Sequence, residues 1–205
     1  MTDFELVGKY ARLTPLNLSH AQALIDAAGA SRTTYQFTSV PNDLKSARLY
    51  VERALDLKAK GDAYPFATVD KSSGKVVGTT RFMTMERWRK GDDSPGPKTK
   101  PNPDVLEIGA TWLAEDVQRT GINTDAKLLM LTHAFEVWNV ARVSLKTDAR
   151  NERSRRNIER VGAKFDGILR AHMPAYDGGI RNTAFYSIVA NEWPEVREAL
   201  KAKLK

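Results

Sequence analysis

A strand, a tight turn and an apolar helix follow one another between residues 105 and 138, and this succession constrains the fold most. The run VLEIGATWL (105–113) is rich in apolar and β-branched residues, which favours a strand. Over residues 123–138, apolar side chains recur at helical spacing and cover a wide face: Leu128, Leu129, Met130, Leu131, Phe135 and Trp138. A helix with so wide an apolar face must be largely buried, so we expect a sheet covered by helices.

The turn VQRTGINTDAK joins this strand to this helix. A helix start leaves about four backbone N–H groups without partners and is partially positive, so a tight strand-to-helix turn can hold a phosphate. Gly121 would allow close approach, and Gln118 and Arg119 would add side-chain donors. The alternative is that Asn123 or Thr124 caps the helix and the glycine is an ordinary turn residue. The turn alone leaves both open, although it lacks a Walker loop and two of the three glycines of the dinucleotide fingerprint.

The rest of the chain alternates between β-rich runs and amphipathic helices. Further strands are predicted at residues 6–13, 64–70, 75–83, 141–148, 163–173 and 182–190, and further helices at 19–28, 42–60 (with Asn42 as N-cap), 151–162 and 191–204. This mixture indicates an α/β (α+β) fold with one sheet flanked by helices, in a single domain over residues 1–205. Four prolines and many charges at residues 89–104 predict an exposed loop insertion, either a lid or a plain insertion.

The composition excludes several classes of protein. With 41% hydrophobic and 28% charged residues in 205, the chain has the composition of a soluble globular domain. It has no cysteine, which excludes disulfides and thiolate chemistry, and its three histidines lack metal-ligand spacing, so no metal is expected. No apolar run approaches the roughly 20 residues of a membrane span, and the N-terminus does not resemble a signal peptide. A cytoplasmic protein without a membrane partner is therefore expected.

The net charge of +7 suggests an anionic partner. Part of the excess lies in the C-terminal run KAKLK, and a second source is one cluster: Arg142, Lys146, Arg150, Arg153, Arg155, Arg156 and Arg160. This cluster could serve a phosphate-bearing cofactor, a nucleic acid or neither. It has no interleaved aromatic residues and no recognised nucleic-acid-binding signature, so a nucleic-acid-binding module is the weaker interpretation.

The order of motifs resembles one known family. EIGATWL, QRTGIN, the buried helix and the run TDARNERSRRNIERVGAK together are similar to the GNAT acyl-CoA N-acyltransferases, and more narrowly to the RimJ/RimL-type branch of ribosomal-protein N-terminal acetyltransferases. The family's cofactor loop reads Gln/Arg-x-x-Gly-x-Gly/Ala, and here Asn123 stands at its last small position. The resemblance is firm over residues 106–190 and compatible over residues 1–85.

The resemblance implies a splayed, mixed, mostly antiparallel sheet of about seven strands, with acetyl-CoA as co-substrate. It implies that the cofactor is bound by Thr111, Trp112, Leu113, Gln118, Arg119, Thr120, Gly121, Ile122, Asn123, Thr124, Asn151 and Ser154. In this family the backbone N–H groups of the loop hold the pyrophosphate, and the main chain of the preceding strand pairs with the pantetheine arm. The asparagine of the Asn-x-x-Ser motif contacts the pantetheine, and its serine lies near the sulfur.

The implied reaction is direct transfer of an acetyl group to a primary amine, either a peptide or protein N-terminus or a small molecule. Glu107 is the candidate base, although a strand glutamate can equally face solvent or form a salt bridge. Ser154 is the candidate proton donor to the thiolate, or an ordinary first-turn serine. Tyr186 could approach the sulfur instead, or simply pack in the core.

The acceptor side is expected to be lined by the first helices, residues 35–37, residues 81–88 and residues 172–176. The identity of the acceptor amine is left open, as is the choice between a monomer and a homodimer. A GNAT-like domain that binds acyl-CoA as a sensor, without catalysis, is the second interpretation.

Overall fold

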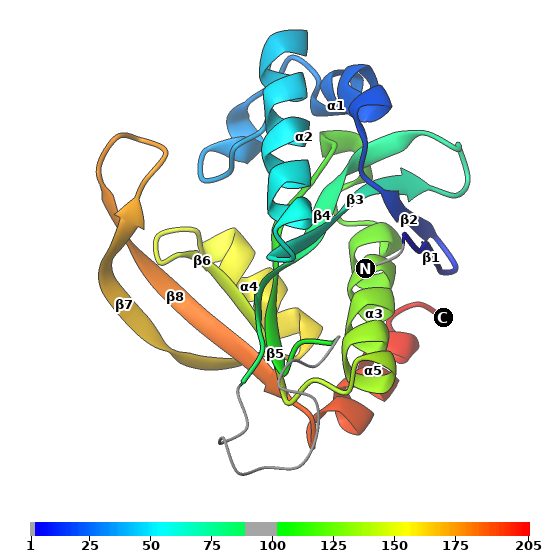
Figure 1. Cartoon of the computed structure of the whole chain (residues 1–205), viewed down its shortest axis with the longest axis vertical. Coiled ribbons are helices and arrows are strands. Elements are labelled where there is room, and N and C mark those ends of the chain that lie inside the picture. The colour runs from blue at the N-terminus through cyan, green and yellow to red at the C-terminus, as the bar shows by residue number, and fades with distance from the viewer. Residues whose placement is uncertain (1–2, 89–101) are drawn as a thin grey trace.

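The computed structural model describes residues 3–88 and 102–205, and these form one sheet with helices on both faces (Figure 1). The strands are β1 (Leu6–Val7), β2 (Ala11–Pro15), β3 (Ala63–Asp70), β4 (Val76–Glu86), β5 (Val105–Leu113), β6 (Arg142–Asp148), β7 (Lys164–Pro174) and β8 (Ile180–Val189). The helices are α1 (Ala21–Ala28), α2 (Leu44–Ala59), α3 (Gly121–Thr132), α4 (Glu152–Val161) and α5 (Trp193–Ala202). The predicted α/β class with a mixed, mostly antiparallel sheet is confirmed. Most of the predicted loop insertion, residues 89–104, lies outside the described residues.

The sheet is divided at the junction of β5 and β6. The strand order is β1-β2-β3-β4-β5-β6-β8-β7, and every neighbouring pair is antiparallel except β5–β6, which is parallel. These two strands pair only from Val105↔Arg142 to Glu107↔Ser144. Beyond Glu107 the edge of β5 that faces β6 has no strand partner within residues 3–88 and 102–205, so the sheet opens there (Figure 1).

The two faces of the sheet are covered by different helices. On β4, Thr80 contacts Met130 of α3, whereas Thr79 hydrogen-bonds Tyr50 of α2. Because successive strand residues point to opposite faces, α3 covers one face and α2 the other. The larger core lies on the α3 face and includes Phe82, which is fully buried. No helix among the described residues has the length and apolar character needed to cross a bilayer.

The N-terminal segment differs from its prediction. A single strand was predicted over residues 6–13, but Gly8–Tyr10 form a tight turn between β1 and β2, so the described residues form eight strands rather than about seven. The carboxylate of Asp125 on α3 holds this turn: its Oδ2 accepts from the backbone N–H groups of Tyr10 (2.6 Å) and Ala11 (2.8 Å). A Cβ atom at Gly8 would lie 2.3 Å from that same oxygen, so only glycine fits.

Helix ends follow ordinary capping rules, with small shifts from the prediction. Asp43 caps α2, accepting from the Ser46 N–H at 2.7 Å, so the prediction of Asn42 as cap was one residue early. The Asn151 cap and Gly162 stop of α4 agree with the predicted helix. After Thr132, α3 continues as a π-helical turn over His133–Val137 and ends near Trp138, where the predicted helix ended.

Candidate active site

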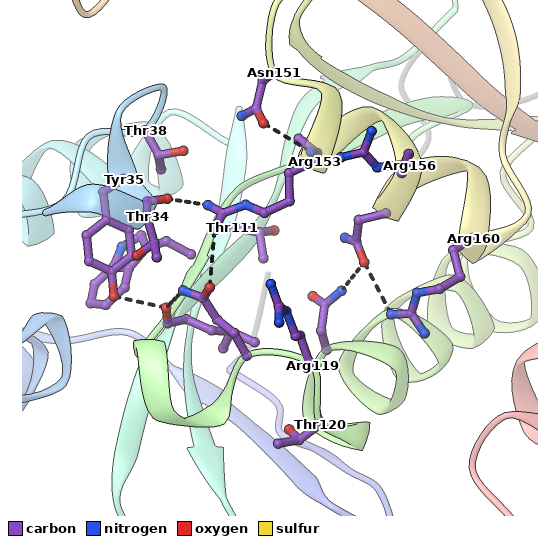
Figure 2. A pocket seen from close by; sticks show the side chains of 16 residues that line it. Thr34, Tyr35, Thr38, Thr111, Arg119, Thr120, Asn151, Arg153, Arg156 and Arg160 are labelled. Carbon is purple, nitrogen blue, oxygen red and sulfur yellow. Dashed lines mark hydrogen bonds between the residues drawn. The ribbon is translucent and has the colours of Figure 1, made fainter. Parts of the chain in front are cut away.

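A cleft of about 590 Å³ lies where β5 and β6 separate, between the N-terminal ends of α3 and α4 (Figure 2). It brings together nine of the twelve predicted cofactor residues: Thr111, Trp112, Leu113, Gln118, Arg119, Thr120, Asn123, Asn151 and Ser154. The side chains of Ile122 and Thr124 are buried, and together with Gly121 they are not among the lining residues. Residues separated by about 40 positions in the sequence thus meet in one cavity.

The wall contributed by β5 is an open strand edge. Residues 108–113 pair with β4 on one side and have no registered partner in β6 on the other. The register with β4 shifts near Thr79, and opposite this shift Ala110 has φ 47°, which makes a bulge in β5. Main-chain groups on such an edge can pair with an extended ligand as if it were another strand.

The end of β5 is fixed from two directions. The Leu113 carbonyl accepts from Gln118 Nε2 and from the Tyr35 hydroxyl, both at 3.0 Å. Tyr35 lies in the segment before α2, far from β5 in the sequence, so no local pattern predicted this contact. The side chain of Gln118 is therefore used to fix the turn, although the residue also lines the cleft.

The turn before α3 ends in a capped helix start. Thr120 is the N-cap: its hydroxyl accepts from the Ile122 N–H (3.3 Å) and donates to the Val117 carbonyl (2.7 Å). The helix begins at Gly121, two residues earlier than predicted, so the alternative of a cap at Asn123 or Thr124 is wrong. The first-turn N–H groups have no intrahelical acceptor and give this end of the cleft a partial positive charge.

Glycine is needed at position 121 because of packing. A Cβ atom there would lie 2.8 Å from Cδ2 of Tyr10, so a larger residue would displace that ring. The left-handed backbone conformation falls instead on Arg119, with φ 65°. Its side chain reaches from the turn toward α4 in Figure 2, and its guanidinium has no hydrogen bond or ion pair with any described residue.

Four arginines surround the cleft: Arg119 from the turn, and Arg153, Arg156 and Arg160 from α4 (Figure 2). Arg153 Nη1 donates to Gln118 Oε1 at 3.4 Å, and its Nη2 donates to the Thr34 carbonyl. Guanidinium groups beside a helix N-terminus are suited to phosphate oxygens. The donor set therefore fits the pyrophosphate and phosphate groups of a coenzyme A derivative.

The predicted basic cluster is divided by the fold. Arg153, Arg156 and Arg160 line the cleft. Three other members of the cluster are paired with side chains of the protein itself. Lys146 binds Glu107 (2.9 Å), and Arg150 binds Asp148 (2.8 Å). Arg155 Nε donates to the Tyr186 hydroxyl (2.9 Å). Only part of the cluster is thus available to an anionic ligand in the cleft.

The start of α4 contributes Asn151 and Ser154. Asn151 Oδ1 accepts from the Ser154 N–H at 3.0 Å and thereby caps the helix. Both residues line the cleft, and their contacts with the pantetheine and the sulfur stay predictions.

Glu107 lies on the α2 face of the sheet. It is 5% exposed, and its Oε2 forms the ion pair with Lys146. Its Oε1 lies over Gly109, where a Cβ atom would be 2.7 Å away. The carboxylate is thus buried and oriented just before the bulge at Ala110, while the salt bridge that was the alternative reading is also present.

Tyr186 is fully buried, and the structure does not bring it into the cleft. Its hydroxyl accepts from Arg155 Nε and donates to Glu159 Oε1 (3.1 Å), both on α4. These two hydrogen bonds attach α4 to β8, the strand that carries Tyr186.

Lys127 was not predicted as a site residue. It is 3% exposed, and its Nζ donates to the hydroxyls of Thr111 (2.8 Å) and Thr80 (3.3 Å) beneath the cleft wall. Burial lowers the pKa of Lys127 to about 7. A lysine within the apolar run of α3 was the sequence signal that could have revealed it.

A second cavity, of about 580 Å³, lies on the α2 face of β4 and β5. The residues that matter for its chemistry are Arg32, Thr38, Tyr50, Arg53, Arg81, Ala110 and Tyr176. Thr38 lines both cavities, and Ala110 of the second adjoins Thr111 of the first. Arg81 and Tyr176 belong to segments predicted to line the acceptor side.

Comparison with known proteins agrees with this arrangement. Residues 11–164 match the family described as "Acetyltransferase (GNAT) domain". The protein named "Putative ribosomal N-acetyltransferase YdaF" of Bacillus subtilis (strain 168) is 34% identical over 88 residues, which are 42% of this chain and 46% of that relative.

Solved structures match over nearly the whole chain. A GCN5-related N-acetyltransferase from Brucella melitensis has a TM-score of 0.82 and 28% identity, covering 100% of this chain and 87% of that one. Mycobacterium smegmatis RimJ, solved with CoA-disulfide, has the same fold, with a TM-score of 0.76 and 20% identity over 98% of this chain and 93% of that one. The names YdaF and RimJ agree with the predicted RimJ/RimL-like branch. The chain belongs to the GNAT acetyltransferase family and is an acyltransferase.

Proposed function

We propose that this protein transfers the acetyl group of acetyl-CoA to a primary amine by direct attack on the thioester. The observation that carries the proposal is the cleft, where an open strand edge, a helix N-terminus and four arginines converge. Solved relatives of this fold include a RimJ bound to CoA-disulfide, which supports a coenzyme A derivative as the ligand.

The chain's own groups suit the parts of such a ligand. The first turn of α3 and Arg119 would hold the pyrophosphate. The main chain of Thr111, Trp112 and Leu113 would pair with the extended pantetheine arm, because this edge of β5 lacks a strand partner. Asn151 and Ser154 would contact the same arm from the opposite wall.

The reaction needs no covalent enzyme intermediate, and the chain has no cysteine to form a thioester. The amine nitrogen attacks the thioester carbonyl carbon, a C–N bond forms, the C–S bond breaks, and coenzyme A leaves as the thiol. The attacking nitrogen loses a proton, for which Glu107 is the proposed base, directly or through a water. The leaving sulfur gains a proton, for which Ser154 is the proposed donor. A backbone N–H of β5 would stabilise the oxyanion.

The proposal is tested first by binding and then by turnover. Acetyl-CoA and free CoA at millimolar concentration should raise the melting temperature, whereas ATP should raise it less, because only the former occupy the pantetheine wall. Thiol release should then follow addition of peptides, polyamines, aminoglycosides or amino acids. Absence of any shift with acetyl-CoA would refute the cofactor assignment. Binding without turnover across the whole amine panel would instead support the sensor interpretation.

A further inference from the structure

Arg81 is a buried cation without an anionic partner. Its side chain projects from β4 onto the α2 face, and the residue is 7% exposed. Its Nε is fully buried and has no hydrogen-bond partner. No ion pair or side-chain hydrogen bond joins its guanidinium to any described residue, and its Cζ lies over the Tyr50 ring, 5.3 Å from the ring centre.

Burial of the unpaired Arg81 guanidinium costs free energy unless an anion binds to it. A guanidinium group stays protonated in proteins, so burying it buries a positive charge. A cation–π contact replaces only part of the lost hydration. Arg81 lines the second cavity, so an anionic partner for it would lie within that cavity.

The charged residues around Arg81 in this cavity are all positive. Arg32 and Arg53 also line it, and none of the described residues that line it is Asp or Glu. Glu107, on the same face, is already paired with Lys146. Tyr176 also lines the cavity, and the adjacent Asp177 forms an ion pair with Arg150 (2.6 Å) that anchors this turn. A preformed cavity with only positive charges favours an anionic ligand.

The second cavity also lies where an acceptor would have to be. It adjoins the cleft at Thr38 and at the bulge of Ala110, next to the β5 edge that would hold the thioester. Because Arg81↔Gly109 and Met83↔Glu107 are cross-strand pairs, Arg81 and Glu107 lie on the same face. Arg81 lines the second cavity and Glu107 does not, so an acceptor held in this cavity would meet Arg81 directly, with Glu107 further along the same face.

We propose that the acceptor amine carries a carboxylate, and that Arg81 binds this carboxylate in the second cavity. This rests on the proposed acetyl transfer and narrows its substrate class. The carboxylate can belong to a free amino acid or to the acidic first side chain of a peptide. A purely cationic acceptor, such as a polyamine, is disfavoured because it would place further positive charge beside three arginines.

The test compares matched acceptors that differ in one charge. The first pair is an α-amino acid and its α-amide, and the second is a peptide that begins with Glu and one that begins with Gln. In at least one pair, kcat/KM for the carboxylate member should exceed that of the neutral member by about tenfold or more. The pair that responds identifies the source of the carboxylate.

The variant Arg81→Met should reduce that preference to within about twofold, because the charge-assisted bond is lost. Comparing the ratio in wild type and variant cancels the different basicity of the two amines. The dissociation constant for acetyl-CoA should not change, since Arg81 does not line the cleft. Arg53→Gln, which removes an exposed arginine from the same cavity, is the matched control and should keep the preference.

Circular dichroism and melting temperature show whether Arg81→Met folds. If it does not fold, the inference is tested by the wild-type preference for the carboxylate acceptor and by Arg81→Lys. The lysine keeps the positive charge but loses the planar guanidinium fork, so this variant should weaken the preference. Equal kcat/KM within both pairs, or a preference that survives in a folded Arg81→Met, would overturn the inference while leaving acetyl transfer intact. Failure to transfer to any amine would overturn the proposed function as well.

Discussion

The two faces of the β4–β5 pair each bury a cation, and they do so differently. On the α3 face, Lys127 donates to the hydroxyls of Thr80 and Thr111. On the α2 face, Arg81 lies against the Tyr50 ring and has no acidic partner among the described residues. Both residues are more than nine-tenths buried.

The difference follows from the chemistry of the two groups. A lysine can escape the cost of burial by losing its proton, and burial lowers the pKa of Lys127 to about 7. A guanidinium group has no such escape. Lys127 can therefore be satisfied by the scaffold alone, whereas Arg81 is satisfied only when a ligand brings an anion.

The largest effect that separates the two faces is expected at Glu107, which lies on the same face as Arg81. Glu107→Gln should lower kcat by about 100-fold or more, because it removes the proposed base, and should leave the affinity for acetyl-CoA unchanged. Steady-state kinetics and calorimetry measure the two effects.

The matched control is Lys146→Gln, which breaks the same ion pair but keeps the carboxylate. Both variants should lose similar stability, and only Glu107→Gln should lose most of its turnover. Equal kcat in the two variants would mean that Glu107 acts only as a salt-bridge partner.

On the other face, Lys127→Met should stabilise the protein at pH 7 by about 2 kcal/mol or more, because it removes a buried group that is partly charged there. In the wild type the folded pKa of about 7 lies below the usual 10.5. The unfolded chain therefore binds more protons between these values, and stability should rise as pH increases from 7 to 10 by up to about 1.4 kcal/mol per pH unit.

Urea unfolding of both proteins at pH 7, 8, 9 and 10 measures this difference. The free energy of unfolding of Lys127→Met should rise less steeply with pH than that of the wild type, because the lysine's contribution is missing. The same slope in both proteins would show that Lys127 keeps its proton in the fold, and the contrast with Arg81 would then disappear.

An exposed cation provides the third test. Arg119→Gln should raise the dissociation constant for acetyl-CoA about tenfold, with an effect that shrinks at high salt, and should leave kcat at saturation unchanged. Arg142→Gln makes the same charge change on an exposed residue outside the cleft and should have little effect. Titration calorimetry at two salt concentrations distinguishes a specific phosphate contact from the general positive charge of the molecule.

The smallest effect is expected at Tyr186, a buried polar group whose partners are all on α4. Tyr186→Phe should cost about 1 kcal/mol of stability through its lost hydrogen bonds to Arg155 and Glu159, with kcat nearly unchanged. Chemical denaturation and initial rates measure these separately. A large loss of kcat with unaltered stability would restore Tyr186 to the reaction.

The elements that form the cleft could be predicted because their signals are local. The strand at 105–113, the turn before α3 and the start of α4 are short contiguous runs, and each carries its own capping or turn chemistry. The shift of the α3 start to Gly121 came from a competition between three adjacent residues that can all cap.

The acceptor side could be predicted only in outline because it depends on distant contacts. The sequence indicated which segments would line it. That Arg81 lacks an acidic partner among the described residues depends on how distant segments pack around it. Likewise, nothing near Gly8 reveals that Asp125 will occupy the space beside it. Such contacts form only in the assembled fold and produce no periodic pattern in the sequence.

The attachment of the N-terminal turn to α3 has a consequence for folding. Asp125 binds the N–H groups of Tyr10 and Ala11 across 114 or more residues of chain, and Tyr10 in turn packs against Gly121. Closing so long a loop is slow, so this junction should form late. The turn before α3, although it is formed by a short contiguous run, is therefore completed only when the first residues of the chain pack against it. Recovery of coenzyme binding should then lag behind recovery of helix content during refolding.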